Sequence, residues 1–471
     1  MARADVKDLE RNVSGIELAI SVLKQRFGDR LQTSKSLREQ HANSTTYLPV
    51  QLPDAVVFAE GEDDVRETVR VCAEFKAPVI AYGTGTSLEG HVNAPAGGIS
   101  LDLTRMNRIL AVHAEDLDVT VEAGVTREQL NNHLRDMGLF FPIDPGANAS
   151  LGGMAATRAS GTNAVRYGTM RDNVISLKAV MADARLVRTS QRARKTSAGY
   201  DLTRLLVGSE GTLGIITELT LRLQGIPEAI SAAVVSFPTV EAACNATILA
   251  LQSGIPVARI ELLDRLTVEA VNSYSKLGLP KQPLLLLEFH GTQAGVREQA
   301  ETFGEIAADL GGSDYEWVTE TEGRNRLWKA RHNAYWAIRA MQPGKQALAT
   351  DVCVPISRLA ECVTETERDI AEAGIYAPIL GHVGDGNFHA SVCCDPANAD
   401  ELRRAEDVVE RLAMRAIAME GTCTGEHGIG QGKRRFMKLE HGAGADYMRA
   451  IKMAFDPDNI LNPGKVLPIA D

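Results

Sequence analysis

Histidines and a glutamate are concentrated in two short, glycine-flanked segments in the second half of the chain. The first segment, Gly381 to His389, contains His382 and His389, seven residues apart across a Gly-Asp-Gly turn. The second is the pair Glu426-His427, which begins thirty-seven residues after His389. Two imidazole nitrogens and one carboxylate oxygen form the ligand set of a catalytic metal site with open positions. His382, His389 and Glu426 are therefore candidate metal ligands.

His427 lies outside this ligand set and is the candidate catalytic base. An imidazole titrates near neutral pH and can accept a proton from a hydroxyl group, while a metal polarises the substrate as a Lewis acid. A simpler interpretation stays open at this point. The segment Gly384 to Asn387 is then an ordinary turn, and the histidines are separate side chains with their own hydrogen-bond partners.

Three glycine-rich loops in the first half of the chain predict a large, extended cofactor. The first loop, 83–87, follows an apolar run, and its backbone N–H groups can form a concave turn that holds a pyrophosphate. It matches neither a Rossmann fingerprint nor a Walker sequence. The second stretch, 144–157 with 161–167, has almost no bulky side chains, and the third, 208–216, runs into a strand. A chain gives up this much packing where a ligand lies against the backbone.

These loops supply the candidate cofactor-binding residues. They are glycines together with small, polar or directly flanking residues: Gly83, Thr84, Gly85, Thr86, Ser87, Pro145, Gly146, Ser150, Gly152, Gly153, Thr157, Gly161, Asn163, Tyr167, Gly168, Glu210, Gly211, Gly214, Ile215 and Ile216.

The same loops resemble the FAD-binding half of the vanillyl-alcohol-oxidase superfamily of flavoenzymes. The resemblance implies a PCMH-type FAD-binding domain of two subdomains, whose loops wrap the pyrophosphate, adenine and isoalloxazine of FAD. Members that bind flavin covalently place a histidine inside the first loop, where this chain has Thr86. The resemblance therefore implies non-covalent FAD, and we expect His91, which follows the loop, to have a structural or supporting role.

The segments 381–389 and 421–430, together with Asn462-Pro463-Gly464-Lys465, resemble the FAD-linked oxidase C-terminal domain of D-2-hydroxyacid dehydrogenases. The two resemblances together cover the chain from about residue 50 to residue 468. They imply that the metal is Zn or Mn, that His427 is the base, and that Asn462 returns to the flavin. The implied reaction is oxidation of a D-2-hydroxy acid by hydride transfer to flavin N5, with a metal-oriented substrate.

Trp328-Lys329-Ala330-Arg331 resembles the tryptophan-x-x-arginine segment of this family and makes Arg331 the candidate clamp for the substrate carboxylate. A guanidinium matches a carboxylate through two parallel hydrogen bonds. The alternative is an ordinary surface arginine on a helix.

The stretch 349–359 resembles the cytochrome-linked D-lactate dehydrogenases most closely, and the hydroxyglutarate enzymes have a lysine where this chain has Ala349. We therefore expect D-lactate as substrate and pyruvate as product. D-2-hydroxyglutarate dehydrogenase and the flavin subunit of glycolate oxidase stay as alternatives, because Lys345 or Arg339 can still reach the pocket.

Composition excludes several classes of protein. The chain has 50 Lys and Arg against 61 Asp and Glu, a net charge of −11, with 44% hydrophobic and 24% charged residues, which is typical of an acidic soluble globular protein. Nucleic acid is disfavoured as a partner, since phosphate binding needs a basic surface. No apolar run approaches the roughly 18 residues of a transmembrane helix, although attachment at a membrane surface stays open.

We expect a cytoplasmic location. The first eight residues match neither a secretory signal nor an organelle presequence. Seven cysteines without a Cys-x-x-Cys pair fit free thiols in a reducing compartment better than a disulfide framework. Adjacent Cys393 and Cys394 are expected to pack within a strand.

The partners are a small 2-hydroxy acid and an electron acceptor other than NAD: cytochrome c, a quinone or an electron-transfer flavoprotein. No motif identifies the acceptor. The basic run Lys433-Arg434-Arg435 is a candidate docking point, although such runs are usually solvated. The sequence leaves a homodimer open.

Two other classes of function also remain open. A metal-dependent hydrolase would use His382, His389 and Glu426 with a bound water, but it leaves the three glycine-rich loops without a role. A non-catalytic flavin electron carrier would need neither the metal nor Arg331.

The elements that must position these residues predict an α+β fold in four parts. Residues 1–48 form a helical lead-in, and 49–226 form the FAD-binding domain. Residues 227–425 form an α+β substrate- and metal-binding domain with an antiparallel sheet, and 426–471 return to the flavin. A strand at 55–58, a helix at 62–75 and a strand at 78–81 lead into the first glycine loop. Period-two alternation at 118–123 and 217–223 predicts half-buried strands.

Overall fold

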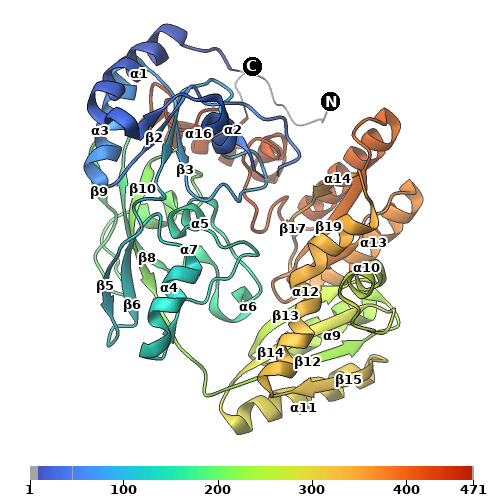
Figure 1. Cartoon of the computed structure of the whole chain (residues 1–471). Coiled ribbons are helices and arrows are strands. Elements are labelled where there is room, and N and C mark those ends of the chain that lie inside the picture. Colours follow the sequence, from blue (N-terminus) through green and yellow to red (C-terminus); the bar gives the residue numbers. More distant parts are fainter. Residues whose placement is uncertain (1–8, 45, 469–471) are drawn as a thin grey trace. The chain divides into compact units, whose positions relative to one another are not determined.

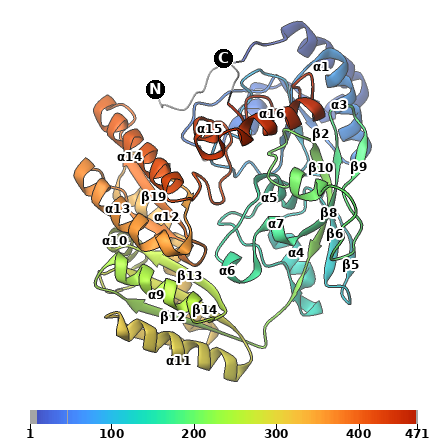
Figure 2. The same cartoon turned by 180° about the vertical axis from the view of Figure 1, so that it is seen from behind.

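The computed structural model describes residues 9–44 and 46–468, with the side chains of Ala330 and His332 left aside. The expectations about the first eight residues lie outside this range. The described chain forms two compact units, drawn from opposite sides in Figures 1 and 2. We call residues 161–168 and 227–425 the central unit, and the other described residues, including 426–468, the N-terminal unit.

One layer of the N-terminal unit is a four-stranded sheet in the order β1-β2-β4-β3. Strands β2 (Ala55–Phe58) and β3 (Val79–Tyr82) both lie parallel to β4 (Ile99–Asp102). Helix α3 (Glu62–Phe75) connects β2 to β3 over the predicted residues. Three acidic residues open this helix, where negative charge is stabilised by the helix dipole.

The helical lead-in predicted at residues 1–48 contains α1 (Val13–Phe27) and α2 (Lys35–Ala42). The apolar face of α1 packs into the same core as the strands of this sheet. Between the helices, β1 (Leu31–Gln32) pairs antiparallel with β2. The segment therefore contributes a strand and part of the core to this layer.

The second sheet of the N-terminal unit has five strands in the order β5-β6-β10-β8-β9. Its strands are antiparallel: β5 (Ile109–His113), β6 (Asp118–Glu122), β10 (Ile215–Arg222), β8 (Val174–Val180) and β9 (Leu186–Arg188).

The expectation that β6 and β10 are half-buried is wrong. Seven of the eight residues of β10 are buried, as are four of the five residues of β6. Strand β10 lies in the middle of the sheet and contacts helices α3 and α5 (Leu151–Thr157). Its charged residue Glu218 is paired with Lys178 at 2.7 Å. The alternating polar residues are therefore paired inside the unit and do not mark a solvent-facing side.

Shorter elements complete the N-terminal unit. They are α4 (Arg127–Leu134), β7 (Leu139–Phe140), α7 (Met170–Asn173), α8 (Leu202–Leu206), β11 (Gln224–Gly225), α15 (Met437–His441) and α16 (Gly444–Phe455).

The central unit is built on an eight-stranded sheet in the order β15-β12-β14-β13-β18-β19-β16, with β17 pairing beside β19. All of its strand pairs are antiparallel, as expected. The strands are β12 (Ala229–Ser236), β13 (Val257–Leu263), β14 (Leu284–Gly291), β15 (Ser313–Val318), β16 (Gln346–Ala349), β17 (Val352–Cys353), β18 (Ile379–Gly381) and β19 (Asn387–Cys394).

Helices cover both faces of this sheet (Figures 1 and 2). Helices α10 (Arg265–Ser275) and α12 (Thr321–Met341) share a core with Leu284 and Leu286 of β14. On the other face, α11 (Gln293–Asp309) packs Phe303 against Phe289 of the same strand. Helix α9 (Val240–Gln252) contacts both α11 and α13 (Leu359–Ala373), and α13 contacts α14 (Ala399–Ala418).

All seven cysteines are free thiols. Cys393 and Cys394 are adjacent on β19 and both are buried, as expected for strand packing. Burial raises the pKa of each of these two thiols to about 11.

Candidate functional site

A buried carboxylate on β13 joins two of the predicted site residues. Oε2 of Glu261 accepts a hydrogen bond from Nε of Arg331 at 2.6 Å, and Oε1 accepts one from Nδ1 of His382 at 2.6 Å. Glu261 is 0% exposed. Burial alone would raise the pKa of this carboxyl, but its interactions with His382 and Arg331 outweigh that effect and lower the pKa. The ionised carboxylate therefore fixes the orientation of both side chains.

Two residues of the tryptophan-x-x-arginine segment contact side chains of β13. Trp328 lies one turn before Arg331 on α12, and the guanidinium of Arg259 stacks over the Trp328 ring at 5.0 Å. Arg259 and Glu261 are alternate residues of β13 and so point to the same face of the sheet. Two contacts, Arg259 to Trp328 and Glu261 to Arg331, thus connect the helix to the strand. Arg331 is a half-buried, paired residue and not a free surface arginine.

The two predicted metal-binding histidines have the same hydrogen-bond arrangement. Nδ1 of His389 lies 2.9 Å from the carbonyl oxygen of Thr350. A carbonyl only accepts, so Nδ1 carries the proton, and the same holds for His382 against the Glu261 carboxylate. Nε2 of each ring is then the acceptor nitrogen, which is the form that binds a metal. The two ring centroids are 5.6 Å apart.

Asp351 is a site residue that sequence reasoning missed. Its Oδ1 accepts a hydrogen bond from Asn387 at 2.8 Å and lies 3.6 Å from Nδ1 of His389. Its Oδ2 accepts one from the hydroxyl of Thr424 at 2.7 Å. Asp351 is 1% exposed and lies between the short strands β16 and β17. An acidic residue between two apolar strand segments is the signal that could have identified it.

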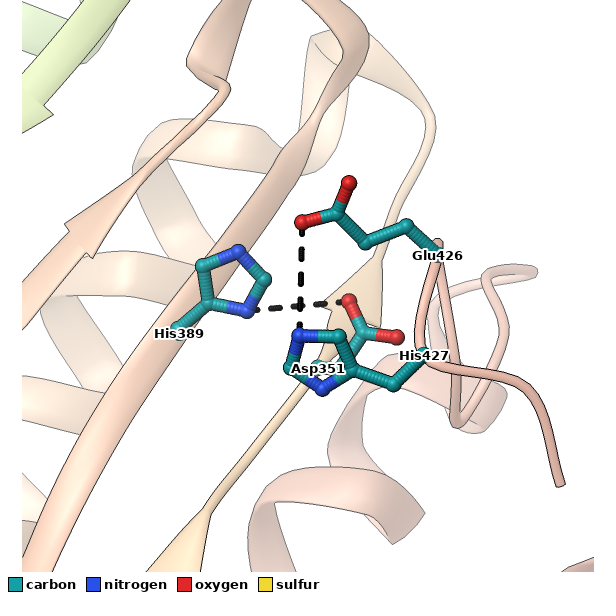
Figure 3. Close-up of side chains that lie close together, drawn as sticks. All are labelled: Asp351, His389, Glu426 and His427. Carbon is teal, nitrogen blue, oxygen red and sulfur yellow. Dashed lines mark ion pairs between the residues drawn. The ribbon is translucent and has the colours of Figure 1, made fainter. Parts of the chain in front are cut away.

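Figure 3 shows four residues that each offer one potential metal-ligand atom: Asp351, His389, Glu426 and His427. The dashed lines mark two ion pairs among them. In the central unit, His389 pairs with Asp351. In the N-terminal unit, Nε2 of His427 lies 4.0 Å from Oε1 of Glu426. Glu426 directly follows Gly425, whose N–H donates to the carbonyl of Asp351 at 3.2 Å. Glu426 is therefore the direct sequence neighbour of a residue that is hydrogen-bonded to Asp351.

Two of the glycine-rich loops meet inside the N-terminal unit. A Cβ atom on Gly83 would collide with Oγ of Ser150, at the start of α5. A Cβ atom on Gly152 would lie 2.6 Å from Cβ of Ala123. Only glycine permits these close approaches of one backbone to the next.

The third loop leaves open space at Gly211, and the first loop, the third loop and Asn462 carry buried polar atoms. A Cβ atom on Gly211 would have no neighbour closer than 3.8 Å, and its φ of +74° favours glycine. Oγ of Ser87, Oγ of Ser209 and Oδ1 of Asn462 are buried and have no hydrogen-bond partner in the described part of the chain. Each such atom costs about 1–3 kcal/mol unless a ligand satisfies it. Hydroxyl donors and a bare backbone are the groups that bind phosphate oxygens and a flat ring, so these residues fit FAD.

Asn462 lies among these loops. Its Nδ2 donates to the carbonyl of Glu210 at 2.7 Å and to that of His91 at 3.3 Å, and its N–H donates to the carbonyl of Val79 at 2.8 Å. These bonds place the C-terminal segment beside β3, directly before the first glycine loop.

Glu210 is buried and holds the C-terminal segment. Its two carboxylate oxygens accept the backbone N–H groups of Ile429 at 2.7 Å and Gly430 at 2.8 Å. Nε2 of His91 lies 3.2 Å from the same carboxylate, in keeping with a structural role. Burial would raise the pKa of Glu210, but His91 and the two N–H groups outweigh that effect and lower the pKa.

The other predicted cofactor-binding residues of this unit lie on or next to its loops. Thr84, Gly85 and Thr86 follow β3, Pro145 and Gly146 precede α5, Gly153 and Thr157 lie on α5, and Gly214, Ile215 and Ile216 lead into and begin β10.

Four predicted cofactor residues belong to the central unit, whereas the others belong to the N-terminal unit. The four are Gly161, Asn163, Tyr167 and Gly168. Oδ1 of Asn163 accepts a hydrogen bond from Nε of Arg259 at 2.8 Å. The hydroxyl of Tyr167 lies 2.7 Å from Nδ1 of His290.

A second polar network that sequence reasoning missed lies on the neighbouring strand β14. Nε2 of His290 lies 2.7 Å from Oε1 of Glu288, and both residues are buried. The available signal was the same in β13 and β14, namely charged residues within otherwise apolar strands.

The basic run at 433–435 is not a solvated docking surface. Lys433 and Arg434 are buried, and Nζ of Lys433 lies 3.3 Å from Oε1 of Glu89. The guanidinium of Arg435 stacks over Phe436 at 4.7 Å. These cations are engaged inside the N-terminal unit because burial requires them to be paired or stacked.

Comparison with known proteins matches two family models to this chain. One, described as FAD binding domain, matches residues 53–190, and the other, described as FAD linked oxidases, C-terminal domain, matches residues 226–466. The chain is 50% identical to a probable mitochondrial D-lactate dehydrogenase of Danio rerio, over 97% of this chain and 93% of that protein. It is 46% identical to a mitochondrial D-lactate dehydrogenase [cytochrome] of Arabidopsis thaliana, over 95% of this chain and 80% of that one.

A solved structure of the 4-ethylphenol oxidase from Gulosibacter chungangensis has the same fold. The TM-score is 0.79 at 17% sequence identity, and the alignment covers 98% of each chain. This similarity supports the expected α+β fold of a PCMH-type FAD-binding domain and an oxidase C-terminal domain.

The expected cytoplasmic location is contradicted, because four D-lactate dehydrogenases to which this chain is similar are named mitochondrial. Among the described residues, no helix is long and apolar enough to cross a membrane.

The predicted family is confirmed by both the family models and the relatives, which extend over nearly the whole chain. This chain belongs to the FAD-linked oxidases, in the group that includes the cytochrome-type D-lactate dehydrogenases.

Proposed function

We propose that this protein oxidises D-lactate to pyruvate, using non-covalent FAD and a divalent metal, Zn or Mn. The observation that carries the proposal is the contact of Arg331 and His382 with one buried carboxylate, Glu261. A guanidinium suits a carboxylate, and a metal held by an imidazole suits a hydroxyl group. A 2-hydroxy acid carries these two groups on adjacent carbons. The names of the relatives support D-lactate as the substrate.

His382, His389 and Glu426 would hold the metal. The Nδ1 hydrogen bonds of both histidines support this assignment, since they leave Nε2 as the acceptor nitrogen. Asp351 offers a further carboxylate beside His389. When bound, the metal would supply Lewis-acid polarisation of the substrate oxygens.

FAD would be held by the loop Gly83 to Ser87, by Ser209 and Gly211 of the third loop, and by Asn462. The unpartnered buried atoms of Ser87, Ser209 and Asn462 support this assignment. The resemblance to the flavoenzyme superfamily implies that Thr86 stands where covalent members have a histidine, which supports non-covalent FAD. When bound, FAD would supply the acceptor for the C2 hydride.

Arg331 binds the substrate carboxylate through its Nη groups, because its Nε is bonded to Glu261. His427 removes the proton of the C2 hydroxyl as the C2 hydrogen leaves with its electron pair, and the product is the 2-oxo acid. Holding the substrate at both oxygen-bearing groups limits its rotation and fixes the face from which the hydride departs.

The selectivity for a monocarboxylate is supported by the surroundings of Ala349. Nζ of Lys345 is held by Glu401 at 2.6 Å, and Arg339 is exposed. We therefore assign neither Lys345 nor Arg339 to the binding of a second substrate carboxylate. D-2-hydroxyglutarate and glycolate are the alternative substrates, and a cytochrome is the proposed electron acceptor.

Steady-state turnover tests this proposal. The protein, loaded with FAD and either Zn²⁺ or Mn²⁺, is assayed with cytochrome c against D-lactate, L-lactate, D-2-hydroxyglutarate and glycolate. We expect the highest kcat/KM with D-lactate. Higher kcat/KM with another of the three substrates would contradict the assignment.

A further inference from the structure

The two oxygens of Glu261 are used by two different site residues. Oε2 accepts from Arg331 and Oε1 from His382, each at 2.6 Å, and the carboxylate is shielded from water. Such charge-assisted hydrogen bonds are short and strong, and a buried carboxylate that loses one partner is strongly destabilised. The orientation of Arg331 therefore depends on a group that also contacts His382.

The contact with Glu261 determines which N–H groups of the Arg331 guanidinium remain for a ligand. Glu261 takes the Nε side of Arg331, so a second carboxylate must approach the Nη groups at the end of the fork. The contact with His382 determines which ring nitrogen carries the proton.

We propose that Glu261 is a positioning residue that couples the substrate clamp to the metal site, by orienting Arg331 and by selecting the metal-binding tautomer of His382. This inference rests on the proposed function. It assigns Glu261 no contact with the substrate or the cofactor.

A purely structural role makes a different prediction. If Glu261 only neutralises charge in the interior, its replacement lowers stability without a specific effect on metal or substrate binding. Unfolding measurements alone do not separate the two roles, so metal affinity is the informative measurement.

Glu261→Gln is the main variant. An amide has nearly the same shape, but it offers one accepting oxygen and one donating nitrogen. Because Arg331 and His382 both donate to Glu261, the amide can serve only one of them. We expect about 10–100-fold weaker Mn²⁺ binding to the FAD-loaded, metal-free protein, as is typical when the partner of a metal-binding histidine is removed. The KM for D-lactate should also rise.

Asp264→Asn is the matched control. Asp264 directly follows β13, is buried, and accepts the N–H of Thr267 at 2.7 Å as the cap of α10. Its role as the cap of α10 is separate from the contacts of Glu261 with Arg331 and His382, and asparagine caps helices equally well. We expect Mn²⁺ affinity and the KM for D-lactate to stay within about twofold of the unchanged protein, within the small effect expected when a cap is conserved.

Glu261→Asp keeps the proposal falsifiable if the glutamine variant does not fold. Aspartate retains the charge but is one methylene shorter, so it cannot keep both 2.6 Å contacts without movement of the strand. We expect Mn²⁺ binding weaker than in the unchanged protein and a raised KM. Near-UV circular dichroism checks that each variant is folded.

Binding of Mn²⁺ is measured by titration calorimetry. Weakening of both Mn²⁺ and D-lactate binding in the Glu261 variants, but not in Asp264→Asn, supports the coupling. An effect on only one ligand, no effect, or the same effect in the control overturns it. Mn²⁺ binding without flavin reduction by D-lactate would reject the proposed substrate and leave the effect on His382 standing. Absence of Mn²⁺ binding in the unchanged protein would overturn both the metal site and the coupling.

Discussion

Nε of Arg331, on helix α12, lies 2.6 Å from Oε2 of Glu261, on strand β13. The two residues are 70 positions apart in the sequence, and the Glu261 carboxylate is inaccessible to water. The contact holds the guanidinium from its side. The remaining donors of Arg331 can therefore bind a substrate carboxylate without a large loss of side-chain entropy.

Arg331→Lys is expected to weaken substrate binding. An ammonium group is a single point charge and cannot contact Glu261 from the side while binding a carboxylate through two parallel hydrogen bonds. We expect the KM for D-lactate to rise about 10–100-fold, with a smaller change in kcat, since the lost hydrogen bonds to charged groups are worth about 1.5–3 kcal/mol. Steady-state kinetics measure this, with exposed Arg339→Lys as the control. A KM equal to that of the unchanged protein would remove Arg331 from the carboxylate site.

His427→Ala tests the proposed base. Loss of a general base typically lowers the rate by about 10²–10⁴-fold, and we expect that loss in the rate of flavin reduction by D-lactate. FAD content should not change, because FAD is assigned to other residues. His441→Ala is the control, since His441 is an exposed histidine at the end of α15. Flavin reduction at the original rate in His427→Ala would refute the assignment.

Ala349→Lys tests substrate selectivity. Ala349 ends strand β16, where it is opposite Ser391 of β19. In the hydroxyglutarate enzymes that the chain resembles, a lysine that helps hold the second carboxylate falls where this chain has Ala349. We expect the ratio of kcat/KM for D-2-hydroxyglutarate to that for D-lactate to rise by about tenfold or more, the effect of one added ionic hydrogen bond. Competition assays with both substrates measure this ratio, and an unchanged ratio would count against the selectivity argument.

Lys465 predicts a dependence of stability on pH. Burial lowers the pKa of this amine to about 7, and its Nζ donates to the carbonyl of Asn93 at 2.8 Å. Between about pH 7 and 10.5 the unfolded chain keeps a proton on Lys465 that the folded chain has released, so this residue makes stability rise with pH, by at most about 1.4 kcal/mol per pH unit. Lys465→Met should remove this contribution.

Urea unfolding at pH 7, 8 and 9 measures the effect of Lys465. The difference in unfolding free energy between the unchanged protein and Lys465→Met should shift with pH in favour of the unchanged protein. The comparison of slopes is independent of the packing change that methionine introduces. Equal slopes would show that Lys465 keeps its proton in the folded protein.

Local patterns predicted the elements well where the determinants lie close together in the sequence. Helix α3 spans the predicted residues 62–75 because its apolar spacing, acidic first turn and preceding glycine all lie within that segment. The burial of β10 could not be predicted in the same way. It depends on β6, β8 and covering helices that lie elsewhere in the sequence, and on the partner that Lys178 provides for Glu218.

Some of the site residues could likewise be predicted from local sequence patterns, and others could not. The types and spacing of His382, His389 and Glu426 indicated a metal site without any knowledge of the fold, and their assignment as ligands stays a prediction. Glu261 could not be found in this way, because it lies 121 residues from His382. Its role appears only when the order of the sheet places β13 beside β18.

Composition also could not predict which unit a loop joins. The small residues of 161–168 indicate a ligand nearby, as those of 83–87 do. Their membership of the central unit follows from long-range contacts such as that of Asn163 with Arg259. For Lys433, similarly, a run of positive charge did not reveal its buried partner Glu89.

The visible absorption spectrum during anaerobic titration with D-lactate tests the central claim most directly. The purified protein, loaded with FAD and Mn²⁺, should show a flavin band that D-lactate bleaches within the enzyme's turnover time and that L-lactate leaves unchanged. Pyruvate should form in a one-to-one ratio with reduced flavin. A flavin band that D-lactate does not bleach, or a protein that takes up no FAD, would contradict the account.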